Sequence, residues 1–418
     1  MLKVLFENHH LYYLPNFIPI IDVMNKRNQY DIYASIPAMM PKDEKNIFTN
    51  ALKRLNIKII ISENENKRVE IIKDKKFDII IVGNVGQLNN IVNDDTLAVM
   101  VYHGIGLKQS YYNDIDSRID LRSVESKTRM LELKEHGHQN LVLTGFTKCD
   151  PLVKSENILD FDSMGLKGNQ KTVLYAPSFY PSSLDQLLPS LGSISYETNL
   201  IVKLHNFSWH QKKYIYQSKS IIELSKKFEN IYLVPPEEFN IIPFYTISDM
   251  LVSDISSTIF EYLYLNRPII MADCFKLRTK HQIFNKRFLK KIDIERMESV
   301  DFTLRLSDPE NFPSLVYHGL EYPLDLEKER LSAQIEYLHR VDGQASVRLV
   351  DAIEKKIIDN KAGTKIYLSP GEKGYINLEE IYTFLKQADA RELRHIFIAL
   401  DEAREAGQDV APILDQID

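Results

Sequence analysis

The feature that most restricts the fold of this chain is a repeated alternation of short β-rich runs with amphipathic segments. In the first 150 residues, the β-rich runs are Leu2–Phe6, Asp31–Ser35, Lys58–Ile61, Phe77–Val82, Leu97–Tyr102 and Asn140–Leu143. Helical patterns such as Leu14–Asn25 and Lys42–Leu55 lie between them. The run Phe77–Val82 (FDIIIV) has no polar alternation after Asp78, as expected for a strand covered on both faces. The pattern predicts βαβ units and a buried parallel sheet.

The same alternation restarts at about residue 171. Expected strands are Thr172–Ala176, Leu200–Leu204, Ile231–Val234, Met250–Ser253 and Pro268–Met271, and expected helices are Gln211–Phe228, Glu237–Tyr245, Leu326–Arg340 and Ala345–Lys356. The polar, turn-rich stretch 151–170 is the expected linker. We therefore predict two Rossmann-like domains, 1–150 and 171–360, with a ligand cleft at the carboxyl ends of their strands.

Beyond about residue 360 the composition changes from Asn-, Ile- and Lys-rich to Ala-, Glu-, Asp- and Arg-rich. Residues 361–418 are expected to form a small appended helical tail. We place no chemistry there.

Composition excludes several classes of protein. The net charge of −6 argues against a general nucleic-acid binder, which usually carries a basic face. The sequence contains no run of 18 apolar residues, and its amino-terminal apolar run is too short for a signal peptide. Cys149 and Cys274 are isolated, which fits a reducing compartment and excludes a cysteine-based zinc site. A cytoplasmic protein is expected.

The segment Ser248–Met271 reads as a strand, a polar turn, a helix start and a second strand. The turn holds Asp254 followed by three hydroxyl residues, Ser256, Ser257 and Thr258. Hydroxyls and backbone N–H groups at a helix start suit a phosphate or pyrophosphate. The alternative is an ordinary helix cap, since Ser and Thr are favoured there. Three consecutive hydroxyls exceed what capping requires, so an anion site is predicted.

Two histidines follow predicted strands. His103 lies in VYHGIGLKQS, where Gly104 and Gly106 allow a tight turn and Lys108 can reach an anion. Its unperturbed pKa near neutrality suits a general base. His205 ends the run LIVKLH, which is apolar apart from Lys203, and could donate to a phosphate oxygen. A structural hydrogen-bonding role is the alternative for each.

Weaker candidates surround these. Ser178 and Phe179 follow the first strand of the second domain and could contact a nucleobase or phosphate. His9 and His10 follow the first strand of the chain and could line an acceptor site. Glycine-rich phosphate loops and a GxSxG nucleophile elbow are missing from the sequence, which disfavours dehydrogenase, P-loop and hydrolase functions.

Taken in order, HGIGLK, the segment Thr144–Asp150, APSF, KLH and SDISSTIFEYLYLNRPII resemble the CDP-glycerol glycerophosphotransferase family of teichoic acid and capsule synthesis. The resemblance covers roughly residues 97–350. This sequence differs from the family pattern at four places. It has Asn206 where the family has proline, Ile255 where the family has an aromatic residue, Ser178-Phe179 in place of Thr-Trp, and Lys148 in place of arginine. These differences leave glycerol, ribitol or another polyol open as the donor's alcohol.

The resemblance implies a GT-B-like fold with a CDP-alditol donor in the cleft. In that arrangement His103 deprotonates an acceptor hydroxyl, which attacks the β-phosphorus and expels CMP, while His205 and Lys108 stabilise the developing charge. Donor contacts are implied for Ser178, Ser256, Ser257 and Thr258, with Glu261 on the ribose hydroxyls. An alternative for Glu261 is a favourable charge in the first helical turn. Asp254 is expected to orient the turn.

The resemblance also implies a lipid-linked or oligosaccharide acceptor at the inner membrane face. Any peripheral contact there would depend on local basic clusters such as Lys286–Lys291, for which a solvated helix face is the alternative. No cofactor is expected, although a divalent cation could assist a diphosphate donor. Two alternatives stay open: a GT-B glycosyltransferase using a CMP-sugar (sialyltransferase-like) or a UDP-sugar, and a non-catalytic scaffold protein.

Overall fold

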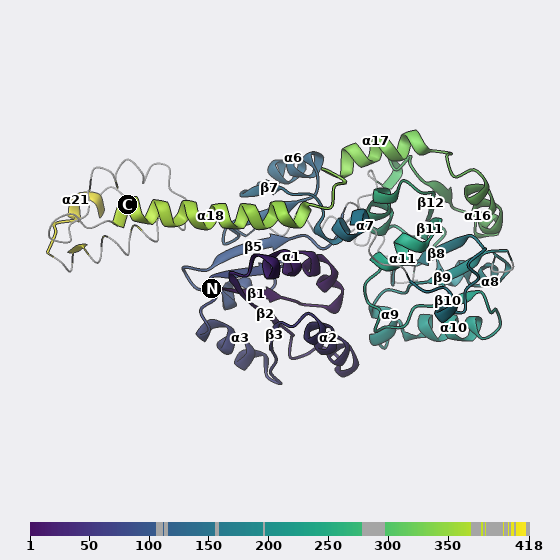
Figure 1. Cartoon of the computed structure of the whole chain (residues 1–418), viewed down its shortest axis with the longest axis horizontal. Helices are drawn as coiled ribbons and strands as arrows, with labels where there is room; N and C mark the ends of the chain where they lie inside the picture. Colours follow the sequence, from purple (N-terminus) through teal and green to yellow (C-terminus); the bar gives the residue numbers. More distant parts are fainter. Residues whose placement is uncertain are drawn as a thin grey trace.

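The computed structural model describes residues 1–105, 112, 116–154, 159–194, 197–277 and 297–368, together with residues 378, 381, 396, 400, 403–404 and 407–414. Two parallel α/β domains lie side by side (Figure 1). One has a seven-stranded sheet and the other a six-stranded sheet. This confirms the predicted fold class.

The sheet of the first domain is entirely parallel and has the order β3-β2-β1-β4-β5-β6-β7. Its strands are β1 (Leu2–Glu7), β2 (Tyr30–Ser35), β3 (Lys58–Ile60), β4 (Ile79–Val82), β5 (Leu97–Val101), β6 (Leu121–Val124) and β7 (Leu141–Leu143). The sequence analysis missed β6 because Arg122 and Ser123 interrupt its apolar pattern. Both are buried, and Ser123 exchanges a hydrogen bond with Thr144 of the neighbouring segment.

Helices cover both faces of this sheet. They are α1 (Leu14–Arg27), α2 (Lys42–Arg54), α3 (Glu65–Asp74), α4 (Leu88–Ile91) and α6 (Lys127–Glu135). Along β4, Ile79 and Ile81 join the core beneath α1 and α2, whereas Ile80 and Val82 join the core on the opposite face. This alternation explains why β4 is apolar at every position.

The sheet of the second domain has the order β10-β9-β8-β11-β12-β13 and is also parallel. Its strands are β8 (Thr172–Ala176), β9 (Asn199–Val202), β10 (Ile231–Leu233), β11 (Met250–Ser253), β12 (Ile269–Ala272) and β13 (Leu304–Leu306). The five predicted strands are confirmed, and the short edge strand β13 was missed. The helices are α8 (Leu184–Ile194), α9 (Phe207–His210), α10 (Ile215–Ser225), α11 (Ile242–Ile247), α12 (Thr258–Glu261), α16 (Phe312–Glu321) and α17 (Glu327–Tyr337).

Some helices are shorter than expected. The segment predicted as one helix from Glu237 begins only at Ile242, with Pro243 in its first turn. The helix expected after the hydroxyl turn is α12, which has four residues and continues as a 3-10 turn, Tyr262–Leu265. A helix this short adds little macrodipole, so any anion binding at the turn depends mainly on side chains.

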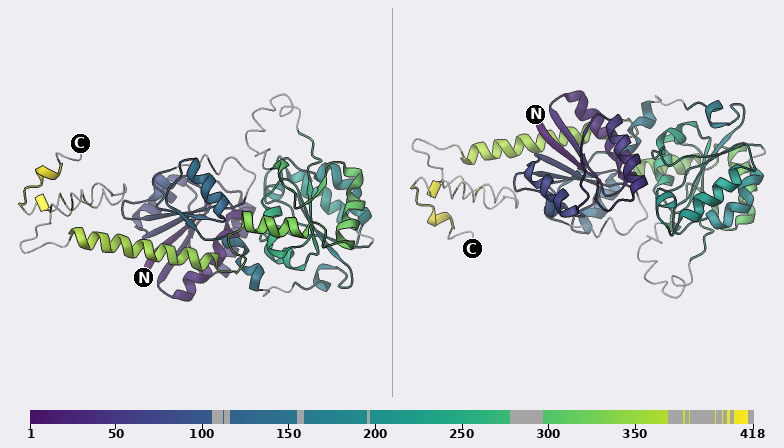
Figure 2. Two further views of the ribbon diagram at one scale, coloured as in Figure 1. Left: turned by 90° about the horizontal axis from the view of Figure 1, so that it is seen from above. Right: turned by 90° about the horizontal axis from the view of Figure 1, so that it is seen from below.

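The polypeptide returns to the first domain at its last long helix, α18 (Ala345–Leu368). Leu349, Val350 and Ile353 enter the core of the first domain, and Arg27 of α1 pairs with Asp351 and Glu354. Figures 1 and 2 show α18 starting near the junction of the domains and running along the first domain and past it. The sequence analysis assigned residues up to 360 to the second domain, but this helix packs on the first.

The expected linker contains two short elements, α7 (Asp150–Lys154) and a 3-10 turn at Asp162–Met164. The Asp150 carboxylate accepts hydrogen bonds from the backbone N–H groups of Ala345 and Ser346, at 2.9 and 2.7 Å. It therefore caps the start of α18 and ties the linker to the returning chain. The other domain boundaries stay predictions.

The carboxyl ends of the two sheets face each other. Glu44 of α2 accepts a hydrogen bond from Asn206 (2.7 Å), and Lys148, just after β7, pairs with Glu261 of α12 (2.6 Å). The predicted cleft is therefore present, with direct contacts across it. Among the helices of the described residues, none combines the length and apolar character needed to cross a bilayer.

Candidate functional site

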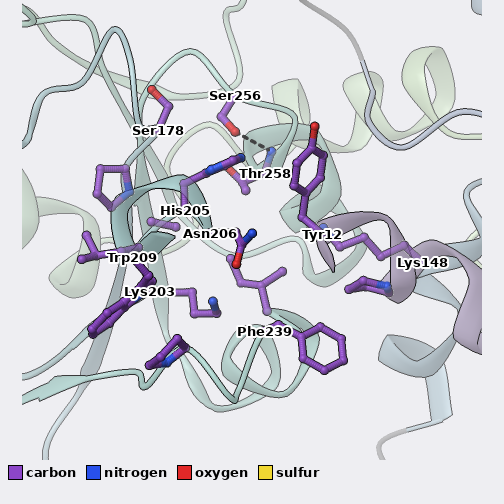
Figure 3. A pocket seen from close by; sticks show the side chains of 16 residues that line it. Tyr12, Lys148, Ser178, Lys203, His205, Asn206, Trp209, Phe239, Ser256 and Thr258 are labelled. Atoms are coloured by element: carbon purple, nitrogen blue, oxygen red, sulfur yellow. Dashed lines mark hydrogen bonds between the residues drawn. The ribbon is translucent and has the colours of Figure 1, made fainter. Parts of the chain in front are cut away.

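A cavity of about 120 Å³ lies where the two domains meet. The first domain contributes Tyr12, Pro15 and Lys148, and the other lining residues come from the second domain. Among these are Ser178, Lys203, His205, Ser256 and Thr258 (Figure 3). We call this the first cavity. It brings together four of the predicted site residues, namely Ser178, His205, Ser256 and Thr258.

Two lysines approach the first cavity from opposite domains. Lys203 follows β9 and is 8% exposed, and none of the described residues forms an ion pair or hydrogen bond with its ammonium group. Burial, with the nearby charge of Lys148, lowers its pKa from 10.5 to about 8, against the opposing effect of the Glu238 charge. Lys148 is held by Glu261. A buried ammonium without a paired carboxylate is costly, and a phosphate in the cavity would relieve that cost.

The three hydroxyls of the predicted anion turn have separate roles. Ser256 and Thr258 line the first cavity, and the Thr258 N–H donates to Ser256 Oγ at 3.5 Å (Figure 3). Ser257 donates to Glu261 at 3.1 Å and does not line the cavity. Glu261 is fully buried and also accepts from Tyr245. In this structure its carboxylate holds elements together, and its predicted contact with ribose stays a prediction.

Asp254 organises the loop that carries Ser178. Its buried carboxylate accepts hydrogen bonds from the Ser178 N–H (2.7 Å) and hydroxyl (3.0 Å), and from the N–H (3.2 Å) and hydroxyl of Ser183. Burial raises the pKa of Asp254 from 3.8 to about 6, against the opposing effect of these hydrogen bonds. The carboxylate does not line the first cavity. This geometry agrees with an orienting role.

The two predicted catalytic histidines both contact the ring of Tyr12. The Tyr12 ring centroid is 5.7 Å from that of His103 and 5.3 Å from that of His205. Tyr12 follows β1 in a 3-10 turn, Leu11–Tyr13, and also stacks on His10 at 5.1 Å. The residues after β1, β5 and β9 therefore converge on one point between the domains.

The histidines have opposite hydrogen-bond settings. His103 Nδ1 lies 3.1 Å from the Gly83 carbonyl oxygen, which can only accept, so Nδ1 carries the proton. The Nε2 of neutral His103 is therefore basic. His205 Nδ1 accepts from the Phe207 N–H at 3.1 Å, so neutral His205 carries its proton on Nε2. In the neutral state, the ring nitrogen without a proton is therefore Nε2 in His103 and Nδ1 in His205.

The remaining candidates are distributed differently. Lys108 lies outside the described residues. His9 packs against Gly86, and His10 contacts Phe207 of the second domain edge-on at 5.2 Å. Burial lowers the pKa of His10, with Glu44 opposing the shift. Among the described residues no group of three or more His, Cys, Asp or Glu side chains could hold a metal ion.

The sequence analysis gave no role to Tyr12, Lys203 or Trp209, which all line the first cavity. A signal existed for Lys203, the single charge in an otherwise apolar run, two residues before His205. No comparable signal existed for Tyr12, because its importance depends on contacts with two residues far along the chain.

Comparison with solved structures agrees with this fold. The wall teichoic acid polymerase TagF is 15% identical, with a TM-score of 0.62 over 86% of this chain and 89% of that one. The UDP-GlcNAc 2-epimerase from Neisseria meningitidis, bound to UDP-GlcNAc, is 16% identical, with a TM-score of 0.54 over 85% and 100%. A glycosyltransferase from Rickettsia africae is 15% identical, with a TM-score of 0.50 over 86% and 99%.

A search of curated proteins finds no match to the chain. The family described as CDP-glycerol:poly(glycerophosphate) glycerophosphotransferase matches residues 116–355, more than half of the chain. The matched region includes Lys148, Ser178, Lys203, His205 and the hydroxyl turn. The chain therefore belongs to the CDP-glycerol:poly(glycerophosphate) glycerophosphotransferase family and is a phosphotransferase enzyme.

Proposed function

We propose that this enzyme transfers glycerol phosphate from CDP-glycerol to an acceptor hydroxyl in the synthesis of a teichoic acid or capsule polymer, releasing CMP. The observation that carries the proposal is the opposite hydrogen-bond setting of His103 and His205 beside a cavity lined by the buried Lys203, which has no ion pair among the described residues. The family supplies the class of donor. The teichoic acid polymer is suggested by the name of the structural neighbour TagF.

In the proposed reaction the acceptor oxygen attacks the β-phosphorus of CDP-glycerol, which carries the glycerol. A new P–O bond forms, the P–O bond to CMP breaks, and the acceptor proton passes to His103 Nε2. His205 donates from Nε2 to a phosphate oxygen. Lys203, and Lys108 if it reaches the site, balance the negative charge. Positioning and electrostatics supply most of the rate enhancement in such transfers, so no covalent intermediate is required.

The donor diphosphate would occupy the first cavity, against Lys203, Ser256 and Thr258. Ser178 would meet the nucleotide from the loop held by Asp254. Glu261 and Ser257 would act behind the cavity, by holding Lys148 and the turn in place. A contact of Glu261 with ribose would require its carboxylate to leave these partners. A divalent cation could assist the diphosphate, although the described residues provide no metal cluster for it.

The acceptor is proposed to be a lipid-linked or oligosaccharide chain at the inner face of the cell membrane, reached by a cytoplasmic enzyme through peripheral contact. The Lys286–Lys291 cluster suggested for that contact lies outside the described residues. Vesicles with and without anionic lipid would test the contact by co-sedimentation.

The decisive experiment measures CMP release from CDP-glycerol, CDP-ribitol and CMP-sialic acid, each with a crude lipid-linked acceptor. Acceptor-dependent release from a CDP-alditol, lost in His103→Ala and retained in His136→Ala, supports the proposal. His136 is an exposed histidine of the same domain and serves as the matched control. Release from CMP-sialic acid alone would instead favour the glycosyltransferase alternative. Normal release by His103→Ala would exclude His103 as the base.

A further inference from the structure

A second cavity, of about 470 Å³, lies beside the first. It is bounded by α2 of the first domain and by α9 and the loop after β10 of the second domain. The two cavities share Trp209, Pro236 and Phe239 as a common wall. Figure 3 shows Trp209, Phe239 and Lys203 among the side chains that line the first cavity. A molecule in the second cavity would therefore lie next to one bound at Lys203.

The polar groups of the second cavity differ from those of the first. Asn46 and Asn50 lie four residues apart on α2, hence on one face of the helix, and both are exposed. Their amides can donate and accept hydrogen bonds at the same time. The size falls within the range of small-molecule sites, about 300–1,000 Å³.

The charges of the second cavity do not favour an anion. Arg54 is opposed by two carboxylates, Asp43 and Glu237. His210 adds little positive charge, because burial lowers its pKa, against the opposing effect of nearby Glu44, Asp43 and Glu237. By contrast, no carboxylate is among the lining residues of the first cavity, where Lys148 is paired with Glu261 and Lys203 forms no ion pair with the described residues. A phosphate-bearing ligand belongs in the first cavity and an uncharged one in the second.

We propose that the second cavity binds an uncharged sugar unit of the acceptor, packed on the Trp209 indole and hydrogen-bonded by Asn46 and Asn50. The indole offers an apolar face to the C–H side of a sugar ring, while the amides suit its hydroxyl groups. This inference rests on the proposed function, because the second cavity can hold the acceptor only if the first cavity holds the donor. It makes the second cavity a specificity site for a sugar-containing acceptor.

Trp209 is the single tryptophan of the chain, so its fluorescence reports on both cavities without an activity assay. Full-length protein is titrated with CMP and then, at saturating CMP, with methyl N-acetyl-β-glucosaminide as the uncharged probe or sn-glycerol 3-phosphate as the charged probe. We expect the glycoside to change the emission in the presence of CMP, and the glycerol phosphate to have a weaker effect.

The variant pair N46A/N50A removes both amides from an exposed helix face. We expect its Kd for the glycoside to rise about tenfold, as for the loss of roughly two hydrogen bonds. Its Kd for CMP should stay within about twofold, which also shows that the variant is folded. Lys53→Ala, an exposed change on α2 outside the cavity, is the matched control and should alter neither constant.

Three results would overturn the inference: no response to the glycoside, competition between CMP and the glycoside, or tighter binding of sn-glycerol 3-phosphate that depends on Asn46 and Asn50. Failure of the proposed function gives a different result. In that case CMP and CDP-glycerol would leave the Trp209 emission unchanged, and the two nucleotides would not compete for binding.

Discussion

The two walls of the cleft differ in chemistry although each is the carboxyl edge of a parallel sheet. The second-domain wall presents Lys203, a hydrogen-bond-donating His205 and the hydroxyls of Ser256 and Thr258. The first-domain wall presents His103 with a basic Nε2, beside Tyr12. Under the function proposed above, the second-domain wall would hold the anionic donor and the first-domain wall would take the acceptor proton. Donor binding and activation of the nucleophile would then belong to separate domains.

The comparison is tested most strongly by the histidines. His103→Ala should reduce kcat by about 10²–10⁴, the usual contribution of a general base. His205→Ala should reduce it by about 10²–10³, as for the loss of one donor to a developing anion. Steady-state kinetics with CDP-glycerol would measure both, with His318→Ala as the control, because the His318 side chain on α16 is 44% exposed. If both variants lost the same factor in kcat and kept the pH–rate profile of the unaltered enzyme, the assignment of His103 as base and His205 as hydrogen-bond donor would be contradicted.

Lys203→Met should have opposite effects on ligand binding and on stability. Without the ammonium group, the Kd for CMP should rise about 10–100-fold, since a charge-assisted contact to phosphate is lost. The free energy of unfolding should increase by on the order of 1–3 kcal/mol below pH 8, because the variant removes a buried charge that has no ion pair among the described residues. Calorimetric titration and denaturant unfolding measure the two effects. If Lys203→Met lowered both the affinity for CMP and the free energy of unfolding, Lys203 would have a structural role.

The pH dependence of Lys203 has a definite sign. Its pKa is about 8 in the folded protein and 10.5 ordinarily, so the unfolded chain holds more protons between these values. Stability conferred at this site therefore rises with pH from about 8 to 10.5, while affinity for CMP falls as the ammonium loses its proton. Lys203→Met should remove both trends. Unfolding curves at pH 7, 8, 9 and 10 would reveal them.

Asp254→Asn tests whether the second wall depends on the loop that Asp254 holds. The folded pKa of about 6 lies above 3.8, so the native state binds the extra proton and stability falls as pH rises from about 4 to 6. In the Asn variant, the free energy of unfolding should no longer decrease between about pH 4 and pH 6. It should also lose about 1–3 kcal/mol at pH 7, since an amide nitrogen replaces one acceptor facing Ser178 or Ser183. Urea unfolding across that pH range is the measurement, and an unchanged slope would exclude Asp254 as its source.

The smallest expected effect concerns the contact between the walls. Asn206→Ala removes the 2.7 Å hydrogen bond to Glu44, but Glu44 still accepts from the Leu11 N–H at 3.3 Å. We expect a loss of about 0.5–1.5 kcal/mol and only a few-fold change in KM for the donor. Lys212→Ala, an exposed change just after α9 of the second domain, serves as comparison. A larger effect on kcat than on KM would indicate that domain closure limits turnover.

Much of the fold followed from local patterns. Eleven strands were expected and all are present, because apolar runs bounded by turn residues are visible without knowledge of their partners. The two missed strands, β6 and β13, are short, and Arg122 and Arg305 interrupt their patterns. The helix after the hydroxyl turn was expected to support anion binding, yet α12 has only four residues.

The candidate site was predicted less completely. His103, His205, Ser178 and the hydroxyl turn were identified because each follows a strand, and the carboxyl ends of parallel strands share one edge. The structure separated their surroundings: Ser256 and Thr258 line the first cavity, whereas Ser257 and Glu261 form a buried group with Lys148. Such sorting depends on side-chain directions in a packed turn, which spacing along the sequence does not specify.

By itself the sequence determined the two parallel sheets, the order of their strands along the chain and the polar residues at their ends, since these depend on neighbours within a few positions. Only the tertiary structure decided that Tyr12 contacts both histidines, that the buried Lys203 forms no ion pair with the described residues, and that α18 returns to the first domain. The contacts across the cleft join residues as far apart as 162 positions, in Asn206–Glu44, and 113 positions, in Lys148–Glu261. Packing of whole domains fixes such pairs, because no local preference can select a partner that distant.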